Sequence, residues 1–253
     1  IALMETNFHD KDAGWTRYVF DTYKIPFTVI KPGEVKEKDM DAFDVIVFPD
    51  SDKSILLEGK YKRSSGTYSI PSYDPQFTKG IGKEGVQKLM KFVNDGGTIV
   101  SWGLSTGLFF GAQSIKISEK EKEEFQLPVS DISSEISKKG LYAPGTLLNI
   151  NLKEGHPLTL GMQKTAKVFS RGRPVFSTSI PYFDTDRRVI ANYPEDNVLA
   201  SGYAKNNQLL EGKSAMVWAK KGKGNFVFYG FYPQFRASTA GTYKLLFNAL
   251  LLK

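Results

Sequence analysis

The sequence predicts an α/β fold: a three-layer, flavodoxin-like, doubly wound and mostly parallel sheet, with insertions and a β-hairpin near the C-terminus. Three observations predict it. Short apolar runs alternate with helical patterns up to Trp102, as in successive βαβ units. Residues 45–48 are apolar throughout, as expected of a strand covered on both faces. Hydrophobic residues make up 41% of the 253-residue chain and charged residues 24%, which is ordinary for a globular protein.

The first half of the chain predicts four strands, over residues 1–4, 26–30, 45–48 and 98–102. Apolar residues at helical spacing predict a helix over 14–23 and another through 86–93, which stops at Asn94-Asp95-Gly96-Gly97. Between them, the polar stretch 50–80 is longer than ordinary connections, so we expect a lid, an excursion or a mobile loop there.

The second half is less regular. Residues 114–141 are charged and Ser-rich, and we expect a helical excursion. Short strands are expected over 147–152, 168–169, 189–193 and 199–204, and a last helix over 239–251. Residues 214–220 and 225–230 flank Lys221-Gly222-Lys223-Gly224, which predicts a hairpin. No linker is evident, so we expect a single domain over 1–253, cut from a longer multidomain protein because the chain begins inside a strand without Met.

Composition excludes several kinds of site. The chain has no cysteine, which rules out disulfides, thiolate metal sites and cysteine nucleophiles. Its net charge is +7, but the lysines are scattered and no nucleic-acid-binding signature is present, so we expect no nucleic-acid partner. No apolar run reaches the roughly 20 residues of a membrane helix, so we expect no membrane span.

Five stretches in a fixed order carry a family resemblance. They are Gly14-Trp15-Thr16-Arg17, residues 43–50, residues 96–100, His156-Pro157-Leu158-Thr159, and residues 230–237. With these, the chain resembles the class I glutamine amidotransferase-like domain that lies C-terminal to the catalytic domain in bacterial carboxypeptidase A-like zinc peptidases. The resemblance implies a non-catalytic accessory or assembly domain of a secreted or periplasmic metallocarboxypeptidase. Its partner would be the peptidase domain of the same polypeptide, and self-association is left open.

The resemblance also indicates which positions of this chain correspond to the catalytic residues of the family. Class I amidotransferases carry a cysteine on a sharp turn after a central strand, and a histidine and a glutamate near the last strand. Those positions correspond here to Ser105, Tyr232 and Gln234. Glutaminase activity needs a thiolate and an imidazole base, so we expect none.

A metal site is not expected either. Zinc catalysis needs three protein ligands and an open position. The only histidines are His9 and His156, and neither begins the H-x-x-E pair of zinc carboxypeptidases. The sequence therefore predicts no metal and no cofactor.

One alternative is a serine hydrolase or peptidase, similar to serine peptidases within the same superfamily. Gly103-Leu104-Ser105-Thr106-Gly107 matches the G-x-S-x-G turn that exposes a nucleophile between a strand and a helix. Such a serine needs a base, and the remaining candidate is His156. We favour a structural turn for Ser105 and a loop or capping role for His156.

Candidate binding residues follow two strands of the predicted sheet. Asp50 ends the third strand, at the carboxyl edge where open α/β sheets bind ligands, and Tyr232, Gln234 and Arg236 follow the last strand. We expect a concavity lined near these residues and Ser105.

This segment has two interpretations. It could be a ligand platform, with aromatic faces stacking on sugars or peptide side chains and Arg236 pairing with a carboxylate. It could instead be an aromatic plug with Arg236 tied to backbone carbonyls or to a neighbouring domain, which we favour. Arg171-Gly172-Arg173 could bind an anion, although solvated turn charges are commoner.

Overall fold

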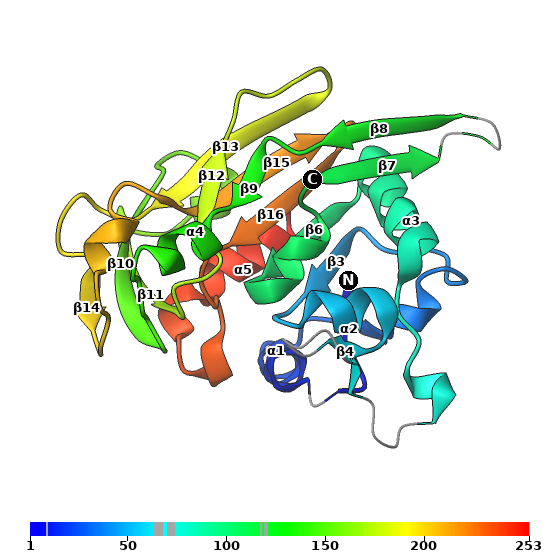
Figure 1. Ribbon diagram of the computed structural model, residues 1–253, viewed down its shortest axis with the longest axis horizontal. Coiled ribbons are helices and arrows are strands. Elements are labelled where there is room, and N and C mark those ends of the chain that lie inside the picture. Colours follow the sequence, from blue (N-terminus) through cyan, green and yellow to red (C-terminus); the bar gives the residue numbers. More distant parts are fainter. Residues whose placement is uncertain (9, 63–67, 70–73, 117, 119–120, 253) are drawn as a thin grey trace.

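One continuous sheet runs through the molecule in a computed structural model, which describes residues 1–8, 10–62, 68–69, 74–116, 118 and 121–252 (Figure 1). Within these residues the main sheet has twelve strands. They are β1 Ala2–Met4, β2 Thr28–Ile30, β3 Val45–Phe48, β6 Thr98–Trp102, β9 Val129–Asp131, β10 Thr146–Leu152, β11 Thr165–Ser170, β12 Phe176–Thr178, β13 Thr185–Asn192, β14 Leu199–Ser201, β15 Ser214–Lys221 and β16 Gly224–Tyr229. Two small hairpins lie outside it: β4 Tyr61–Lys62 with β5 Tyr68–Ser69, and β7 Ala112–Lys116 with β8 Lys122–Gln126.

Helices connect these strands. The α-helices are α1 Lys11–Thr22, α2 Lys53–Glu58, α3 Gly82–Asn94, α4 Ser133–Lys138 and α5 Tyr243–Leu250. Short 3-10 helices are η1 Pro32–Glu34, η2 Pro75–Phe77, η3 Gly103–Leu108, η4 Pro157–Thr159, η5 Asn207–Leu210, η6 Phe235–Ala237 and η7 Ala240–Thr242.

The parallel half of the sheet has the spatial order β2-β1-β3-β6-β16. Counted along the chain, this is the 2-1-3-4-5 order of flavodoxin-like sheets. The α/β class and the mostly parallel central sheet that the sequence predicts are therefore confirmed. Strands β3 and β6 have the predicted bounds: both are buried at every position, β3 is apolar throughout, and β6 carries Thr98 and Ser101 among its apolar residues.

Antiparallel strands extend this sheet from β16. The predicted hairpin is confirmed: β15 pairs with β16 from Met216 opposite Tyr229 to Lys221 opposite Gly224. Strands β13, β10 and β11 then follow in antiparallel order, and β14, β12 and β9 attach beside them. The sheet is thus parallel where helices alternate with strands and antiparallel where hairpins replace the helices.

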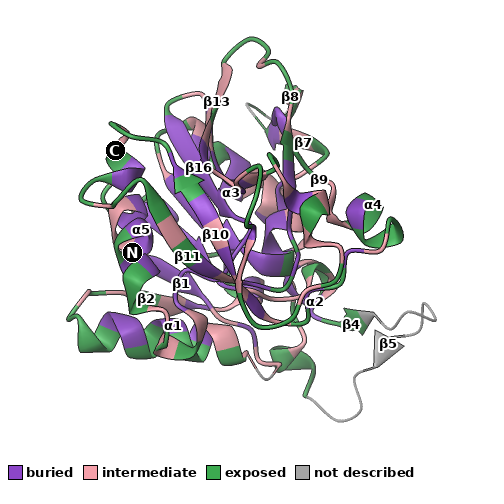
Figure 2. Ribbon diagram, turned by 90° about the vertical axis from the view of Figure 1, so that its left-hand side faces the viewer, coloured by how far each residue is buried: buried purple, intermediate pink, exposed green. Residues whose placement is uncertain are grey.

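Alternate residues of the parallel strands face two separate cores. Figure 2 shows buried residues along the strands in the middle of the molecule and exposed residues on helix α1. Leu3 and Val47 belong to one core, with Phe20 of α1 and Leu246 of α5. Their strand neighbours, such as Ile46, belong to the other core, to which α2 and α3 contribute. Successive strand residues point to opposite faces of a sheet. Since α1 and α5 contribute to one core and α2 and α3 to the other, helices lie on both faces of this half.

One expected element is wrong. Residues 114–141 do not form a helical excursion: the described part holds the β7–β8 hairpin, strand β9 and only the short helix α4. The hairpin alternates inward and outward residues, with Ile115 buried and Lys116 exposed beside it. Lys122 and Glu124 occupy exposed positions of β8, while Glu123 between them is partly buried and pairs with Lys221, so the alternation of a strand decides the structure here more than charge does.

The polar stretch 50–80 is an excursion in the part that the structure describes. It contains α2, β4 and η2, and residues 63–67 and 70–73 lie outside the described residues. Asp52 caps α2 by accepting a hydrogen bond from the Ser54 N–H at 2.7 Å. Among the described residues no helix is long and apolar enough to cross a membrane.

Candidate functional site: a crevice at the carboxyl edge of the sheet

A crevice of about 270 Å³ lies at the carboxyl ends of β1 and β3. In the order β2-β1-β3-β6-β16, the connections from these two strands leave in opposite directions along the sheet, which makes this a topological switch point. The lining residues come from the segments that follow β1, β3, β6, β11 and β16. They are Phe8, Asp10, Lys11, Asp12, Trp15, Asp50, Ser51, Asp52, Ile55, Leu104, Arg171, Tyr232, Phe235 and Arg236.

Asp12 lies on the floor of the crevice, in the first turn of α1. Its Oδ2 accepts hydrogen bonds from the Asp50 backbone N–H at 3.0 Å and from the Trp102 indole N–H. Its Oδ1 accepts one from Gln234 Nε2 at 2.9 Å. A single carboxyl group therefore joins α1 to the ends of β3, β6 and β16.

Asp50 is the second carboxyl group of the floor. Its Oδ1 accepts a hydrogen bond from the Leu104 N–H at 2.7 Å, and its Oδ2 accepts one from the Tyr232 hydroxyl at 2.7 Å. Gly103 makes this approach feasible: its φ is +64°, and a Cβ there would lie 2.2 Å from Asp50 Oδ1. The residue that follows β6 must therefore be a glycine while Asp50 holds the turn.

Gln234 is fully buried behind Asp12. Its Nε2 donates to Asp12 Oδ1 and to Thr16 Oγ1 at 3.0 Å, while its Oε1 has no hydrogen-bond partner among the described residues. Tyr232 and Gln234 are thus both held by aspartates of the crevice. Neither supplies a free base, because both side chains donate the hydrogen bonds that join them to these aspartates.

Burial shifts the proton affinities on this floor. It raises the pKa of Asp12 from its ordinary 3.8 to about 7, and the neighbouring Asp50 charge adds to the rise. Burial likewise raises the pKa of Asp10, whose carboxylate caps α1 through the Ala13 N–H at 3.2 Å. Burial, and after it the Asp50 charge, raises the pKa of the Tyr232 hydroxyl, which stays protonated as a donor to Asp50.

Aromatic and guanidinium groups form the opposite wall. Phe235 stacks on Phe169 with ring centroids 3.5 Å apart, and Arg171 lies 5.5 Å from the Tyr232 ring centroid. Arg236 is exposed and lies over Phe235 at 5.3 Å. No hydrogen bond or ion pair of the Arg236 guanidinium is found within the described ranges, so its contact with the fold is this aromatic face.

Ser105 is placed under the crevice and does not line it. Its side chain is 0% exposed, and its hydroxyl donates to the backbone carbonyls of Trp102 at 2.6 Å and Phe48 at 3.1 Å. The Ser101 hydroxyl is 3.0 Å away. Leu104, and not Ser105, is the residue of the turn that reaches the crevice.

His156 is separated from this turn. It caps η4, where its Nδ1 accepts a hydrogen bond from the Leu158 N–H at 3.2 Å, and it borders a different hollow formed by residues 152–163. Burial lowers its pKa, with smaller effects from Lys153 and Arg188. His9 lies outside the described residues. Among the residues that the structure describes, no group of three or more His, Asp or Glu residues is arranged to hold a metal ion.

Sequence patterns identify part of this site. Asp50, Tyr232 and Arg236 line the crevice, and Gln234 lies directly behind Asp12. The structure adds Asp12, which is absent from the residues expected on the sequence alone. A detectable signal existed: Asp12 follows strand one as Asp50 follows strand three, and the carboxyl ends of parallel strands meet at one edge.

Comparison with known proteins gives fold likeness alone. No protein-family model matches the chain, and no curated protein sequence matches it. Among solved structures, a catalytic mutant of Gan42B, a GH42 β-galactosidase from G. stearothermophilus, has a TM-score of 0.51 at 13% identity and covers 99% of this chain. The β-galactosidase from Bacillus circulans sp. alkalophilus has a TM-score of 0.50 at 13% identity over 98% of this chain.

This chain is much shorter than those enzymes: the matched regions span 29% and 30% of the β-galactosidase chains. A ThuA-like protein from Bacteroides uniformis also matches, with a TM-score of 0.47, 9% identity, and coverage of 98% of this chain and 88% of that chain. At such identities a shared fold carries no activity from one protein to another.

Proposed function

We propose that this chain is a doubly wound, class I amidotransferase-like domain that has lost the catalytic groups of that fold and acts as a non-catalytic accessory or assembly domain. The strand order of the parallel half and the helices on both of its faces support the fold assignment. Binding needs shape and polar partners, whereas turnover also needs an available proton acceptor. The crevice has the first two, so a ligand could bind there without reacting.

The burial and hydrogen bonds of the Ser105 side chain are the main support for a non-catalytic role. A serine nucleophile must reach the substrate and must have a base within hydrogen-bond distance. The Ser105 side chain is fully buried, and its hydroxyl proton is directed to backbone carbonyls, which cannot act as bases. The alternative of a serine hydrolase using Ser105 and His156 would require the turn to be rebuilt.

The finer context is also a proposal. We place the chain in a secreted or periplasmic zinc carboxypeptidase-like protein, next to the peptidase domain of the same polypeptide, on the strength of the five ordered stretches described above. The β-galactosidase matches support one part of this idea, since a similar fold occurs there as less than a third of a longer enzyme chain.

Two activity measurements test the absence of catalysis. The protein is incubated with a fluorophosphonate probe and, separately, with glutamine, and Ser105→Ala is the matched control. We expect no covalent labelling and no ammonia release for either protein. Labelling that disappears in Ser105→Ala would establish the hydrolase alternative, and ammonia release would establish residual amidotransferase chemistry.

The context is tested on the native protein. We expect an antibody against this chain to detect, in the organism of origin, an exported protein longer than 253 residues with zinc-dependent carboxypeptidase activity. A native protein of this length alone, without peptidase activity, would contradict the proposed parent.

A further inference from the structure

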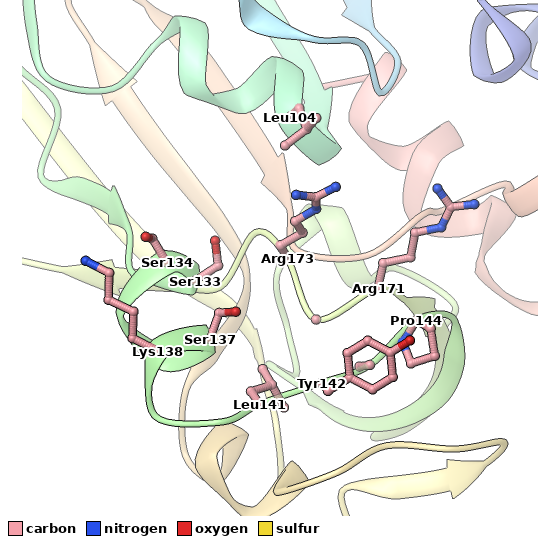
Figure 3. Close-up of a pocket in the computed structure, with 12 residues that line it drawn as sticks. Leu104, Ser133, Ser134, Ser137, Lys138, Leu141, Tyr142, Pro144, Arg171 and Arg173 are labelled. Atoms are coloured by element: carbon pink, nitrogen blue, oxygen red, sulfur yellow. The ribbon is translucent and has the colours of Figure 1, made fainter. Parts of the chain in front are cut away.

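A second and larger hollow, of about 700 Å³, adjoins the crevice. It lies between helix α4 and the turn 171–173 that joins β11 to β12, and Leu104 and Arg171 border both hollows. Figure 3 shows Arg171 and Arg173 extending from this turn toward the side of Leu104, with the serines of α4 across from them. We refer to it as the basic hollow.

The lining of the basic hollow carries positive charge only. Arg171, Arg173 and Lys138 line it, and no aspartate or glutamate does. The acidic residues nearby in the chain are already engaged. Glu135 pairs with Lys139 at 2.7 Å, and the Asp131 carboxylate accepts hydrogen bonds from the backbone N–H groups of Ser133 and Val175.

The cations of the basic hollow lack anionic partners. Within the described residues, neither Arg173 nor Lys138 makes an ion pair, and the Arg171 guanidinium lies against the rings of Tyr232 and Phe235. Like charges brought together without a counter-charge repel one another, so an anion placed among them gains attraction from each. A guanidinium also offers several N–H donors in a planar fork that fits oxyanions.

Hydroxyl groups and a restricted turn complete the hollow. Ser133, Ser134 and Ser137 of α4 line it and can donate hydrogen bonds to oxyanion oxygens. Gly172 sets the two arginines apart: its φ is +71°, and a Cβ there would lie 3.2 Å from Ala143 Cβ. The turn thereby fixes the backbone from which the two exposed arginine side chains extend, and both line the hollow.

We propose that the basic hollow binds a small polyanion, a ligand with two or more phosphate or sulfate groups. The cations are distributed around the hollow, so groups spaced along one ligand engage more of them than a single anion does. Tetrahedral oxyanions accept hydrogen bonds from several directions, which suits guanidiniums on one side and hydroxyls on the other. The proposal concerns a different cavity from the crevice and does not depend on the accessory role.

Calorimetric titration with inorganic tripolyphosphate at about 150 mM salt tests the proposal. We expect binding to the wild-type protein, weakened about tenfold or more in Arg173→Ala and in Arg171→Ala, because each removes a charge-assisted contact. Arg173→Lys should weaken binding less than Arg173→Ala, since the charge is retained and the fork is lost. Orthophosphate should bind more weakly than tripolyphosphate.

The double variant Lys83→Ala/Lys223→Ala is the matched control. Both lysines are exposed, and neither lines the basic hollow, so their loss lowers the net charge without touching the site. We expect its affinity to equal that of the wild type. No tripolyphosphate binding at about 1 mM, or an equal loss in the control, would overturn the proposal. Orthophosphate binding as tight as tripolyphosphate binding would overturn the polyanion class. Unchanged thermal unfolding of Arg173→Ala would show that the variant is folded.

Discussion

At the scale of single residues, Asp12 joins more elements than any other side chain of the crevice floor. Its carboxyl group accepts hydrogen bonds from the Asp50 backbone, Trp102 and Gln234. With its pKa raised to about 7, the folded protein keeps this proton over a pH range in which the unfolded chain has lost it. The contribution of Asp12 to stability therefore falls as pH rises, whereas that of a carboxylate in an ion pair rises with pH.

The sign follows from the proton count. Between pH about 4 and about 7 the folded state binds more protons at Asp12 than the unfolded state, so the free energy of unfolding falls as pH rises, by at most about 1.4 kcal/mol per pH unit. We expect Asp12→Asn to remove this dependence, since the amide needs no proton and can donate to the unpartnered Gln234 Oε1. The measurement is the melting temperature from pH 5 to pH 8 for both proteins. The wild type should lose several degrees relative to the variant across this range. Parallel curves would contradict the raised pKa.

Arg236 gives a second test at this scale. The sequence favours a structural arginine tied to backbone carbonyls or to a neighbouring domain. In the structure the side chain is exposed and lies over Phe235, so the tie to backbone carbonyls is not found among the described residues. We therefore expect Arg236→Ala to shift the melting temperature by only about 1–4 °C, in line with an exposed cation–π contact of about 0.5–1 kcal/mol. A loss of more than about 5 °C would restore the structural interpretation.

The crevice shows what residue patterns can predict. Asp50 and Tyr232 are identifiable because each directly follows an apolar strand, a position that sequence reveals. The hydrogen bond between them joins residues 182 positions apart, and no local pattern encodes that pairing. Ser105 illustrates the converse: its motif is local and easily detected, but burial of its side chain depends on packing against Phe48 and Ser101.

At the scale of elements, the β15–β16 hairpin meets the end of helix α3. Its tip approaches so closely that a Cβ on Gly224 would lie 2.0 Å from the Val93 carbonyl oxygen and 2.3 Å from the Gly97 carbonyl oxygen. Both neighbours are backbone atoms of the helix end and of the segment entering β6, and neither can move without disturbing those elements.

We expect Gly224→Ala to destabilise the protein by about 3 kcal/mol or more, because the hairpin must shift away from α3. Gly241→Ala is the matched control, since a Cβ there meets no atom within 4 Å and its backbone φ is not positive. Urea unfolding of both variants measures the difference. Equal midpoints would show that the close approach has no energetic consequence.

Element prediction succeeds where strand and helix have clear ends. Strands β3 and β6 have the expected bounds, and the Asn94-Asp95-Gly96-Gly97 signal lies at the end of α3. It fails over 114–141, a charged and Ser-rich segment in which we expect a helical excursion. The β7–β8 hairpin is instead fixed by tertiary contacts: Gln87 of α3 donates to the Ser114 hydroxyl, and the Phe125 ring packs against the buried Lys221 ammonium. These contacts link distant parts of the chain.

At the scale of the whole molecule, the sheet has no break between its parallel and antiparallel halves. Strand β16 pairs with β15 over its whole length and, on its other side, with β6 from Asn225 to Tyr229. Unfolding one half would expose the fully buried β16 and break one of its two ladders. We therefore expect the two halves to unfold together.

Two tryptophans report on the halves separately. Trp102 ends β6 in the parallel half, and Trp218 lies in β15. With Trp15 replaced by Phe, variants that retain only Trp102 or only Trp218 should each give a fluorescence transition that coincides with their far-UV circular dichroism transition in urea. Separate transitions would divide the chain into two folding units and would contradict a single domain.

Because Arg171 borders both the crevice and the basic hollow, ligands bound in the two would be coupled through it. Its guanidinium borders both hollows, but one charged group can give its full set of hydrogen bonds to only one ligand at a time. Two anions bound on either side would therefore compete for it, and each would reduce the affinity of the other by the same factor, as thermodynamic linkage requires. A cationic ligand in the crevice, drawn to Asp10 and Asp52, would leave Arg171 to the polyanion and favour joint occupancy. The sign of the cooperativity between the two hollows would therefore report the charge of the ligand in the crevice: negative cooperativity for an anion, positive cooperativity for a cation.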